Sequence, residues 1–264
     1  MMTHRCLPWL VAAAALFAGC RSVPASPPES AVDAVVLVSA NAEWTVVKAL
    51  HPLETYANSP FGEFFTRTVS LANGARRTVV VLHGGWGKVS AAASTQYAID
   101  RWNPPLLINL GTCGGFHGGI DRGAIVLASR TVIYDIIERM GDADEALRDY
   151  STTIDLAWLA DPPPAPVVRT VLVSADQDLD PAAISDLRSR HGAVAGDWES
   201  GAIAYVAARN RRRLLILRGV TDLVGDRGGE AYGNIEVFRR ATDTVMRKLF
   251  ADLPLWLDRA SPAR

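Results

Sequence analysis

The sequence has few of the residues from which covalent or metal cross-links are made. Only three cysteines occur among its 264 residues, and Cys6 and Cys20 both lie in the first twenty. Cys113 is then the single cysteine of the predicted folded domain, which excludes an intramolecular disulfide there. The histidines are scattered, and no Cys/His cluster has the spacing of a metal site. We therefore predict neither a metal nor a cofactor, and we interpret Cys113 as a small buried packing residue.

The sequence also lacks an excess of charge of either sign. Its formal net charge is −1, so no long-range field would attract nucleic acid or acidic lipid. Hydrophobic residues make up 49% and charged residues 21%, which is typical of a globular protein with ample core. Gly87-Lys88 lacks the spacing and the Ser/Thr of a nucleotide P-loop. The run Asp176, Asp178 and Asp180 lacks the Gly and Glu of a calcium loop.

The N-terminal segment has no apolar run long enough to form a stable membrane span, since the run over residues 7–17 is too short. Residues 16–20 (LFAGC) resemble a bacterial lipobox, although Phe17 departs from the usual aliphatic residue. We predict a lipoprotein-type signal peptide over 1–20, lipidation at Cys20 and a flexible tether over 21–33. The expected location is the cell envelope, lipid-anchored and facing the periplasm. The alternative is an ordinary cleaved signal, giving a secreted or soluble periplasmic protein.

Short apolar runs alternate with helical patterns from residue 34 onward. The patterns predict strands over 34–40, 64–71, 77–82, 106–110, 123–137, 167–174, 193–195 and 214–217. They predict helices over 43–50, from 88 to about 102, from Asp180-Pro181, from Glu199 and over 232–250, with a loop or lid over 138–166. Near-continuous apolar strands between helices indicate an α/β fold. We expect a single domain, residues 34–258, with a mixed, mainly parallel sheet covered by helices on both faces.

Polar residues follow several of these predicted strands: Glu43, Thr112, Asp176, Glu199 and Asp222. Ligands of such sheets gather beyond the carboxyl ends of the strands, so we expect these side chains to converge on one rim. Glu199 begins a small, apolar helix, and a buried carboxylate needs hydrogen-bond donors or becomes neutral. The simpler interpretations are that Glu199 complements a helix dipole and that Asp222 caps a turn. The glycine-rich segment 111–115 (GTCGG) is either a ligand-binding loop or a strand-to-loop turn.

Four motifs in order carry a family resemblance: 87–92 (GKVSAA), 108–115 (INLGTCGG), 198–204 (WESGAIA) and 218–222 (RGVTD). With them the chain, over residues 34 to about 253, resembles the nucleoside phosphorylase superfamily. Within it, the sequence is most similar to methylthioadenosine/S-adenosylhomocysteine nucleosidases. This resemblance implies a nucleoside phosphorylase-like fold and cleavage of an N-glycosidic bond.

The resemblance also implies roles for individual residues. Glu199 would accept hydrogen bonds from the ribose hydroxyls, and Asp222 would give a proton to purine N7. Such an acid requires a raised pKa near neutral pH. The residues implied to contact substrate are Gly111, Thr112, Gly114, Trp198 and Thr221.

Two positions bear on the attacking group. Phosphorylases place an arginine just before the glycine-rich segment, where this chain has Asn109, as in the hydrolytic branch. The water-activating glutamate of the hydrolases is matched by Glu43 one residue early, with Trp44 in the expected slot.

We therefore predict a purine nucleosidase with Asp222, Glu199 and Glu43 as catalytic residues, acting on methylthioadenosine, S-adenosylhomocysteine or adenosine. The alternatives are a phosphate-dependent phosphorylase and a non-catalytic nucleoside-binding lipoprotein. The expected partner is a small purine nucleoside, with membrane contact through the lipid anchor only and with assembly as a homodimer.

Overall fold

The computed structural model describes residues 32–260. The predicted signal peptide, Cys20 and nearly all of the tether lie outside the described residues. The strands are β1 (Ala34–Val38), β2 (Ala57–Asn58), β3 (Glu63–Ser70), β4 (Arg76–His83), β5 (Leu106–Phe116), β6 (Ile125–Ile133), β7 (Ser151–Thr153), β8 (Val168–Ser174), β9 (Ala193–Asp197), β10 (Arg213–Gly225) and β11 (Gly228–Gly229). The helices are α1 (Asn41–Leu50), α2 (Gly87–Trp102), α3 (Ala143–Asp149), α4 (Ile184–His191), α5 (Ser200–Arg209) and α6 (Ile235–Arg259), with a 3₁₀ turn, η1 (Pro181–Ala183).

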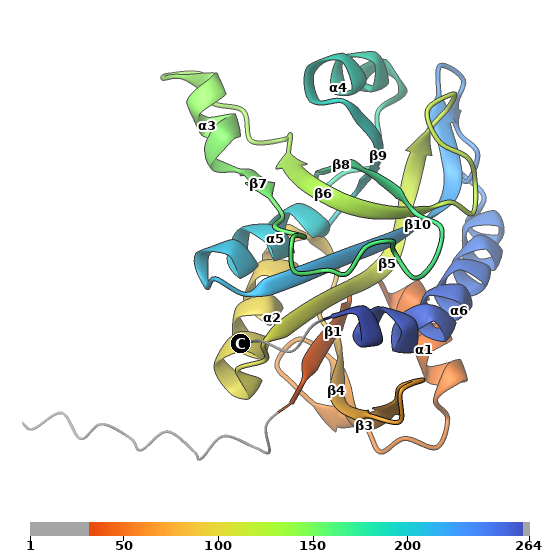
Figure 1. Cartoon of the computed structure of the whole chain (residues 1–264). Helices are drawn as coiled ribbons and strands as arrows, with labels where there is room; N and C mark the ends of the chain where they lie inside the picture. The colour runs from red at the N-terminus through yellow and green to blue at the C-terminus, as the bar shows by residue number, and fades with distance from the viewer. Residues whose placement is uncertain (1–31, 261–264) are drawn as a thin grey trace, which may run out of the picture.

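The strands form one mixed sheet in the order β11-β10-β6-β8-β9-β5-β1-β4-β3-β2, and β10 also pairs with β5 (Figure 1). That extra pairing closes β10, β6, β8, β9 and β5 into a ring. The ladder between β5 and β10 is parallel and runs from Leu106 and Arg213 to Phe116 and Val224. The two long strands therefore carry their carboxyl-terminal segments side by side, and this pair positions the site described below.

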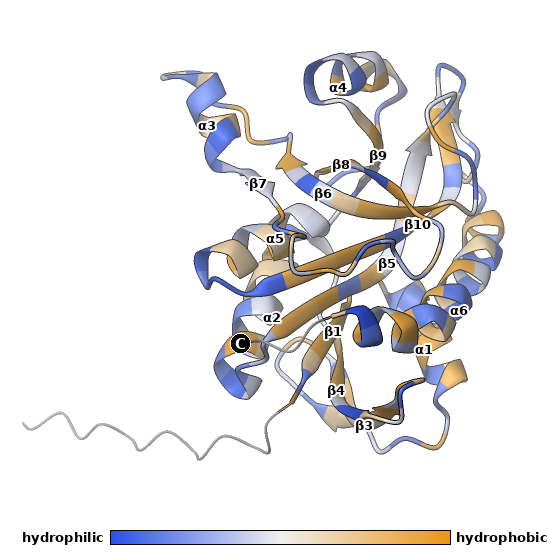
Figure 2. Ribbon diagram, viewed as in Figure 1, coloured by the Kyte–Doolittle hydropathy of each residue, from blue (hydrophilic) through white to orange (hydrophobic). Residues whose placement is uncertain are grey.

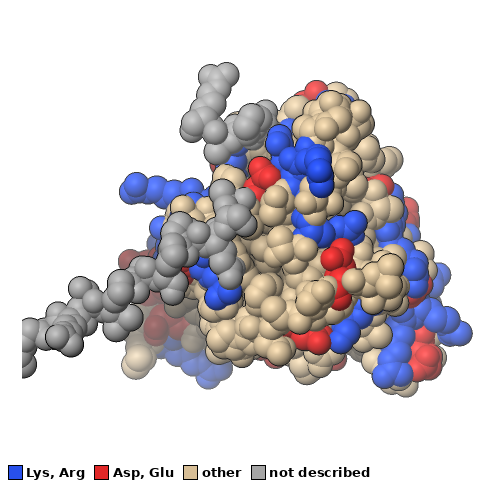
Figure 3. Space-filling view, turned by 90° about the horizontal axis from the view of Figure 1, so that it is seen from below, with Lys and Arg blue, Asp and Glu red and all other residues tan. Residues whose placement is uncertain are grey.

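Helices cover the sheet on both faces because its strands are apolar on both sides (Figure 2). Helices α2 and α5 contribute Ile99, Trp102 and Ile203 to one buried cluster. Helices α1 and α6 contribute Val47 and Trp256 to a second cluster on the other face. The α/β class and the covering by helices are thereby confirmed. Figure 3 shows one outer face on which Lys and Arg lie beside Asp and Glu, as the near-neutral composition predicts.

The structure corrects three predictions about local structure. Segment 111–115 is not a turn, because β5 continues through it to Phe116. Strand β10 likewise extends to Gly225, so Asp222 lies within the strand and not after it. The segment 138–166, predicted as a loop, contains α3 and β7, and the Asp142 side chain caps α3 by accepting from the backbone of Asp144 and Glu145.

Helix α6 begins at Ile235 and ends at Arg259, later at both ends than the predicted 232–250. Among the described residues no helix is long and apolar enough to cross a bilayer.

Candidate active site

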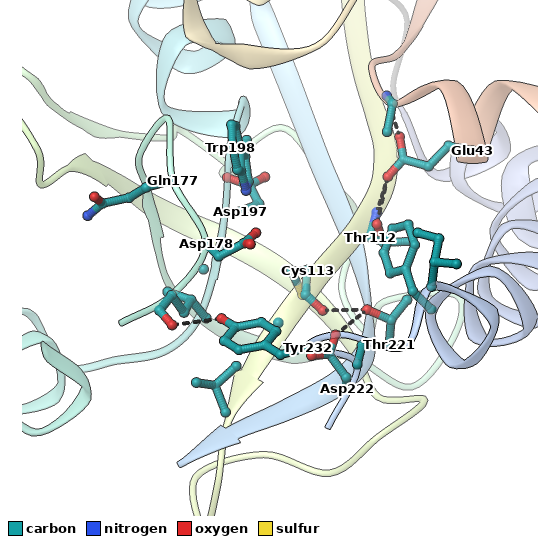
Figure 4. A pocket seen from close by; sticks show the side chains of 18 of the residues that line it. Glu43, Thr112, Cys113, Gln177, Asp178, Asp197, Trp198, Thr221, Asp222 and Tyr232 are labelled. Atoms are coloured by element: carbon teal, nitrogen blue, oxygen red, sulfur yellow. Dashed lines mark hydrogen bonds between the residues drawn. The ribbon is translucent and has the colours of Figure 1, made fainter. Parts of the chain in front are cut away.

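A cavity of about 870 Å³ opens beside the carboxyl-terminal segments of β5, β9 and β10 (Figure 4). Its volume is in the range of small-molecule sites. Glu43, Glu199 and Asp222, which come from three distant parts of the chain, all line it. Of the five residues expected on one rim, Glu43, Thr112, Glu199 and Asp222 line this cavity. Asp176 does not, and its carboxylate accepts from Lys88 N instead.

A buried arginine ties the acidic residues of the cavity together. Arg218, on β10, is 1% exposed. Its Nε lies 2.9 Å from Asp197 Oδ2, its Nη2 3.3 Å from Glu199 Oε2 and its Nη1 3.6 Å from Glu43 Oε1. A planar guanidinium can face three carboxylates at once because its N–H groups point in different directions. Asn109 Oδ1 also accepts from Arg218 Nε, at 3.1 Å.

Gly111 leaves the space in which this arginine lies. A Cβ on Gly111 would be 2.2 Å from Arg218 Nη1 and 2.8 Å from Glu43 Oε1. Any side chain at this position would therefore displace the buried charges. Gly111 is not part of the described cavity wall, whereas Thr112 and Gly114 are. The space that it leaves gives Gly111 a packing role, and its contact with substrate stays a prediction.

Glu43 reaches the cavity from the first turn of α1. Its Oε1 accepts hydrogen bonds from Thr112 N at 2.6 Å and from Thr112 Oγ1 at 2.8 Å. Its Oε2 accepts from Ala40 N at 3.1 Å, which satisfies a free N–H at the helix start. The next residue, Trp44, turns away: its indole stacks on His83 at 5.1 Å and donates to Glu63. Of the two candidate positions, Glu43 and not Trp44 therefore has the side chain that faces the cavity.

Glu199 precedes α5 and is buried, with 4% of its surface exposed. Its Oε1 accepts from Gly87 N at 3.1 Å, at the start of α2. Gly87 has φ of 84°, a backbone conformation that glycine adopts easily. Burial raises the pKa of Glu199 to about 8; Arg218 opposes this shift, and Asp197 and Glu43 add to it. Glu199 is therefore a carboxyl group that exchanges its proton near neutral pH.

Asp222 lies on β10 directly opposite Gly114 of β5. Its Oδ1 accepts from Thr221 Oγ1 at 2.8 Å, and Thr221 Oγ1 also lies 3.3 Å from Cys113 O. Burial raises the pKa of Asp222 above its usual range, although the hydrogen bond from Thr221 works against this shift. A carboxyl group in this condition is suited to donate a proton.

Two tryptophans stand together at the cavity. Trp198 and Trp86 have ring centroids 4.7 Å apart, and both line the wall. Trp86 is 61% exposed, which is unusual for so large an apolar side chain. Cys113 contributes to the wall but is buried, and burial raises the pKa of its thiol, in line with a packing role.

The structure places the predicted residues Glu43, Thr112, Gly114, Trp198, Glu199, Thr221 and Asp222 together in one wall. The sequence reasoning missed Arg218 and Asp197 as parts of the site. An arginine inside the apolar run 214–220 was a usable signal, because a buried guanidinium must be paired. Asp178 and Tyr232 were also missed as wall residues. Among the described residues, no group of three or more His, Cys, Asp or Glu has the arrangement of a metal site.

The fold and this pocket define an α/β protein with an acidic cavity of the size of small-molecule sites. The sequence profile described as the phosphorylase superfamily matches residues 34–251. The chain belongs to the phosphorylase superfamily, which confirms the predicted relationship.

The sequence is also similar to individual proteins of known name. The chain is 25% identical to the 5′-methylthioadenosine/S-adenosylhomocysteine nucleosidase of Bacillus licheniformis over 187 residues, which are 66% of this chain and 81% of that protein. It is 29% identical to the enzyme of the same name from Anoxybacillus flavithermus over 178 residues, or 61% of this chain and 73% of that protein.

Solved structures share the fold. The Arabidopsis thaliana 5′-methylthioadenosine nucleosidase superposes with a TM-score of 0.66 and 22% identity, covering 85% of this chain and 96% of that one. The Colwellia psychrerythraea nucleosidase in complex with adenine gives a TM-score of 0.67 and 17% identity, covering 90% of this chain and 99% of that one.

Proposed function

We propose that this protein is an N-ribosyl hydrolase that cleaves the N-glycosidic bond of a purine nucleoside. The observation that carries the proposal is the cavity wall shared by Asp222, Glu199 and Glu43, in which Arg218 links Glu199 to Glu43. The relatives named above are nucleosidases for methylthioadenosine and S-adenosylhomocysteine. These two compounds and adenosine are the substrates to test first.

The chemistry divides among the three acids. As the C1′–N9 bond breaks, its electron pair moves onto the purine, and Asp222 supplies a proton to N7 so that the base leaves neutral. Positive charge develops on the sugar, where the carboxylate of Glu199 accepts hydrogen bonds from the 2′- and 3′-hydroxyls. A water oxygen attaches to C1′, and Glu43 takes the proton that this water loses. Arg218 positions Glu43 and Glu199 relative to each other, since its guanidinium contacts both.

The charge of the cavity favours water over phosphate as the attacking group. No Lys or Arg is among the described residues that line the cavity, whereas five carboxylates are. A phosphate dianion would therefore meet like charges without a cation in the wall. Arg218 is already occupied by Asp197, Glu199 and Glu43. The phosphorylase alternative thus has less support than hydrolysis.

The test is release of free base from adenosine and methylthioadenosine by the purified protein, followed by chromatography with and without phosphate. Hydrolysis predicts free base and free sugar at the same rate in both conditions. Formation of a sugar 1-phosphate only with phosphate present would instead establish a phosphorylase. Tight binding of intact nucleoside without any product would establish the non-catalytic binder.

We further propose export to the cell envelope through the segment 1–20, lipidation at Cys20 and assembly as a homodimer. Exposed apolar residues beside the site, Trp86 at 61% and Val89 at 82%, support a covered surface on the first turn of α2. Metabolic labelling with a radioactive fatty acid tests the first two points, because Cys20→Ala should abolish the label. Light scattering of the purified protein measures its mass in solution, and a monomeric mass would contradict the proposed homodimer.

A further inference from the structure

Two carboxylates of the cavity wall, Asp197 and Asp178, take no part in the proposed reaction, and of these Asp197 is paired with Arg218 whereas Asp178 is not. Asp178 lies on the loop that follows β8 and, unlike Glu43 and Glu199, it is exposed. Figure 4 shows Asp178 between Trp198 and Tyr232, on the side of the cavity opposite Glu43 and Thr112. A ligand in the cavity would therefore lie beside the carboxylate of Asp178.

The contacts of the neighbouring residue place Asp178 at the same end as Asp222. Leu179 packs on Gly114, since a Cβ on Gly114 would be 3.0 Å from Leu179 Cδ1. Gly114 pairs with Asp222 in the ladder between β5 and β10. The Tyr232 hydroxyl donates to Leu179 O at 2.7 Å, which holds the loop against the segment after β11. The loop of Asp178 therefore lies at the end of the cavity assigned to the base.

Asp178 is also unpartnered within the protein. No hydrogen bond or ion pair joins its carboxylate to another described residue. Asp176, two positions earlier, differs: it accepts from Lys88 N at 2.7 Å and lies 3.8 Å from Lys88 Nζ. The negative charge of Asp178 is thus available to a ligand, and it acts on its surroundings by raising the pKa of Asp222 and of Tyr232, although burial is the larger cause for both groups.

Acidic side chains outnumber cationic ones at the cavity. Five carboxyl groups line its wall, and the nearby guanidinium of Arg218 contacts Glu43, Asp197 and Glu199 but not Asp178 or Asp222. Such a cavity attracts cations and repels anions. The neighbouring indoles of Trp86 and Trp198, tilted by 33° to each other, add aromatic faces that a cation also prefers.

We propose that Asp178 selects nucleosides whose base carries a positive charge, of the class of N7-alkylated purines; this rests on the proposed nucleosidase function. The step balances without an acid. The C1′–N9 electron pair enters the cationic ring and cancels its charge, so the base leaves neutral. Water adds its oxygen to C1′ and gives up one proton to Glu43, and Asp222 donates none.

Because the charge on the base disappears as the bond breaks, Asp178 acts mainly on the bound ground state. Its removal is therefore expected to raise KM for the cationic substrate without lowering kcat. Unit charges at contact distance near a protein surface account for an effect on the order of tenfold.

The experiment compares 7-methylguanosine with guanosine at about pH 6, where the methylated ring is cationic. The proteins are wild type, Asp178→Asn and, as matched control, Asp186→Asn, an exposed residue of α4 paired with Arg190. We expect Asp178→Asn to raise KM for 7-methylguanosine relative to guanosine by about tenfold, with the ratio unchanged in the control. A ratio within about twofold of wild type in Asp178→Asn would overturn the inference.

A second comparison separates this inference from the proposed function. In Asp222→Asn, cleavage of guanosine should fall by about 10²-fold or more, whereas 7-methylguanosine should lose less than about tenfold. If wild type cleaves neither compound and also leaves adenosine and methylthioadenosine intact, the nucleosidase function fails. Calorimetric titration then still decides the role of Asp178, because equal affinity of wild type and Asp178→Asn for 7-methylguanosine would refute it.

Discussion

Replacement of Arg218 by methionine tests the central electrostatic arrangement of the site. The guanidinium is 1% exposed and lies within 2.9 to 3.6 Å of carboxylate oxygens of Asp197, Glu199 and Glu43. Methionine fills similar space but leaves these carboxylates without their counter-charge. Removal of one partner from a buried ion pair costs about 3–5 kcal/mol. For a domain of this size, each kcal/mol lowers Tm by about 2–4 °C, which predicts a decrease of roughly 6–20 °C.

The loss should depend on pH in a defined direction. Arg218 lowers the pKa of Glu199, which burial otherwise raises to about 8. Without the guanidinium, this pKa rises further, so the folded variant binds protons more tightly than the unfolded chain. A carboxyl group whose pKa is raised in the folded state contributes less to the stability of the folded protein as pH increases. Because the pKa of Glu199 is about 8 with Arg218 present, the two proteins diverge only above this pH, and the difference in Tm between Arg218→Met and wild type should be larger at about pH 9.5 than at about pH 7.

The assay is thermal unfolding followed by circular dichroism at both pH values. The matched control is Arg239→Met on α6, which removes an exposed pair with Glu236 and should change stability by less than about 1 kcal/mol. An Arg218→Met protein that unfolds within about 2 °C of wild type at about pH 9.5 would refute the reasoning. A deficit that grows toward acid pH would refute the proposed origin of the instability.

Three further predictions follow from the same contacts. Gly111→Ala should lower stability by about 1–3 kcal/mol in urea unfolding, because its Cβ would lie 2.2 Å from Arg218 Nη1; an unchanged midpoint would show that the buried charges yield without cost. Binding of a non-hydrolysable nucleoside should release close to one proton from Glu199 at about pH 7 and none above about pH 9. The reason is that the pKa of Glu199 is raised to about 8 and that ribose hydroxyls favour the carboxylate. Calorimetry in two buffers measures the proton release, and equal release by Glu199→Gln would contradict the prediction. Glu43→Gln should lower kcat by about 10²-fold with little change in KM, and unchanged steady-state turnover would remove Glu43 from the mechanism.

The fold was predictable to the extent that local patterns determine it. Apolar runs identified most of the longer strands, and the Asp180-Pro181 pair marked a helical start, where the Asp180 side chain does accept from Ala182 N. The patterns failed where tertiary pairing overrides composition. Glycines at 111–115 suggested a turn, but the partner β10 continues the ladder through them. Small residues are needed there because Leu179 and Arg218 occupy the space beside the strand.

The site was predictable in its acids but not in what joins them. Glu43, Glu199 and Asp222 each follow a recognisable segment, whereas the partners of Arg218 depend on how α1, β9 and β10 meet. An arginine within an apolar strand implies that carboxylates surround it, yet the sequence does not say which ones. In the structure these carboxylates are Asp197, Glu199 and Glu43, which has a consequence for the proposed reaction. Because one guanidinium contacts both Glu43 and Glu199, a substitution of either carboxylate alters the electrostatic field at the other, so the effects of the two substitutions on turnover are not expected to be additive.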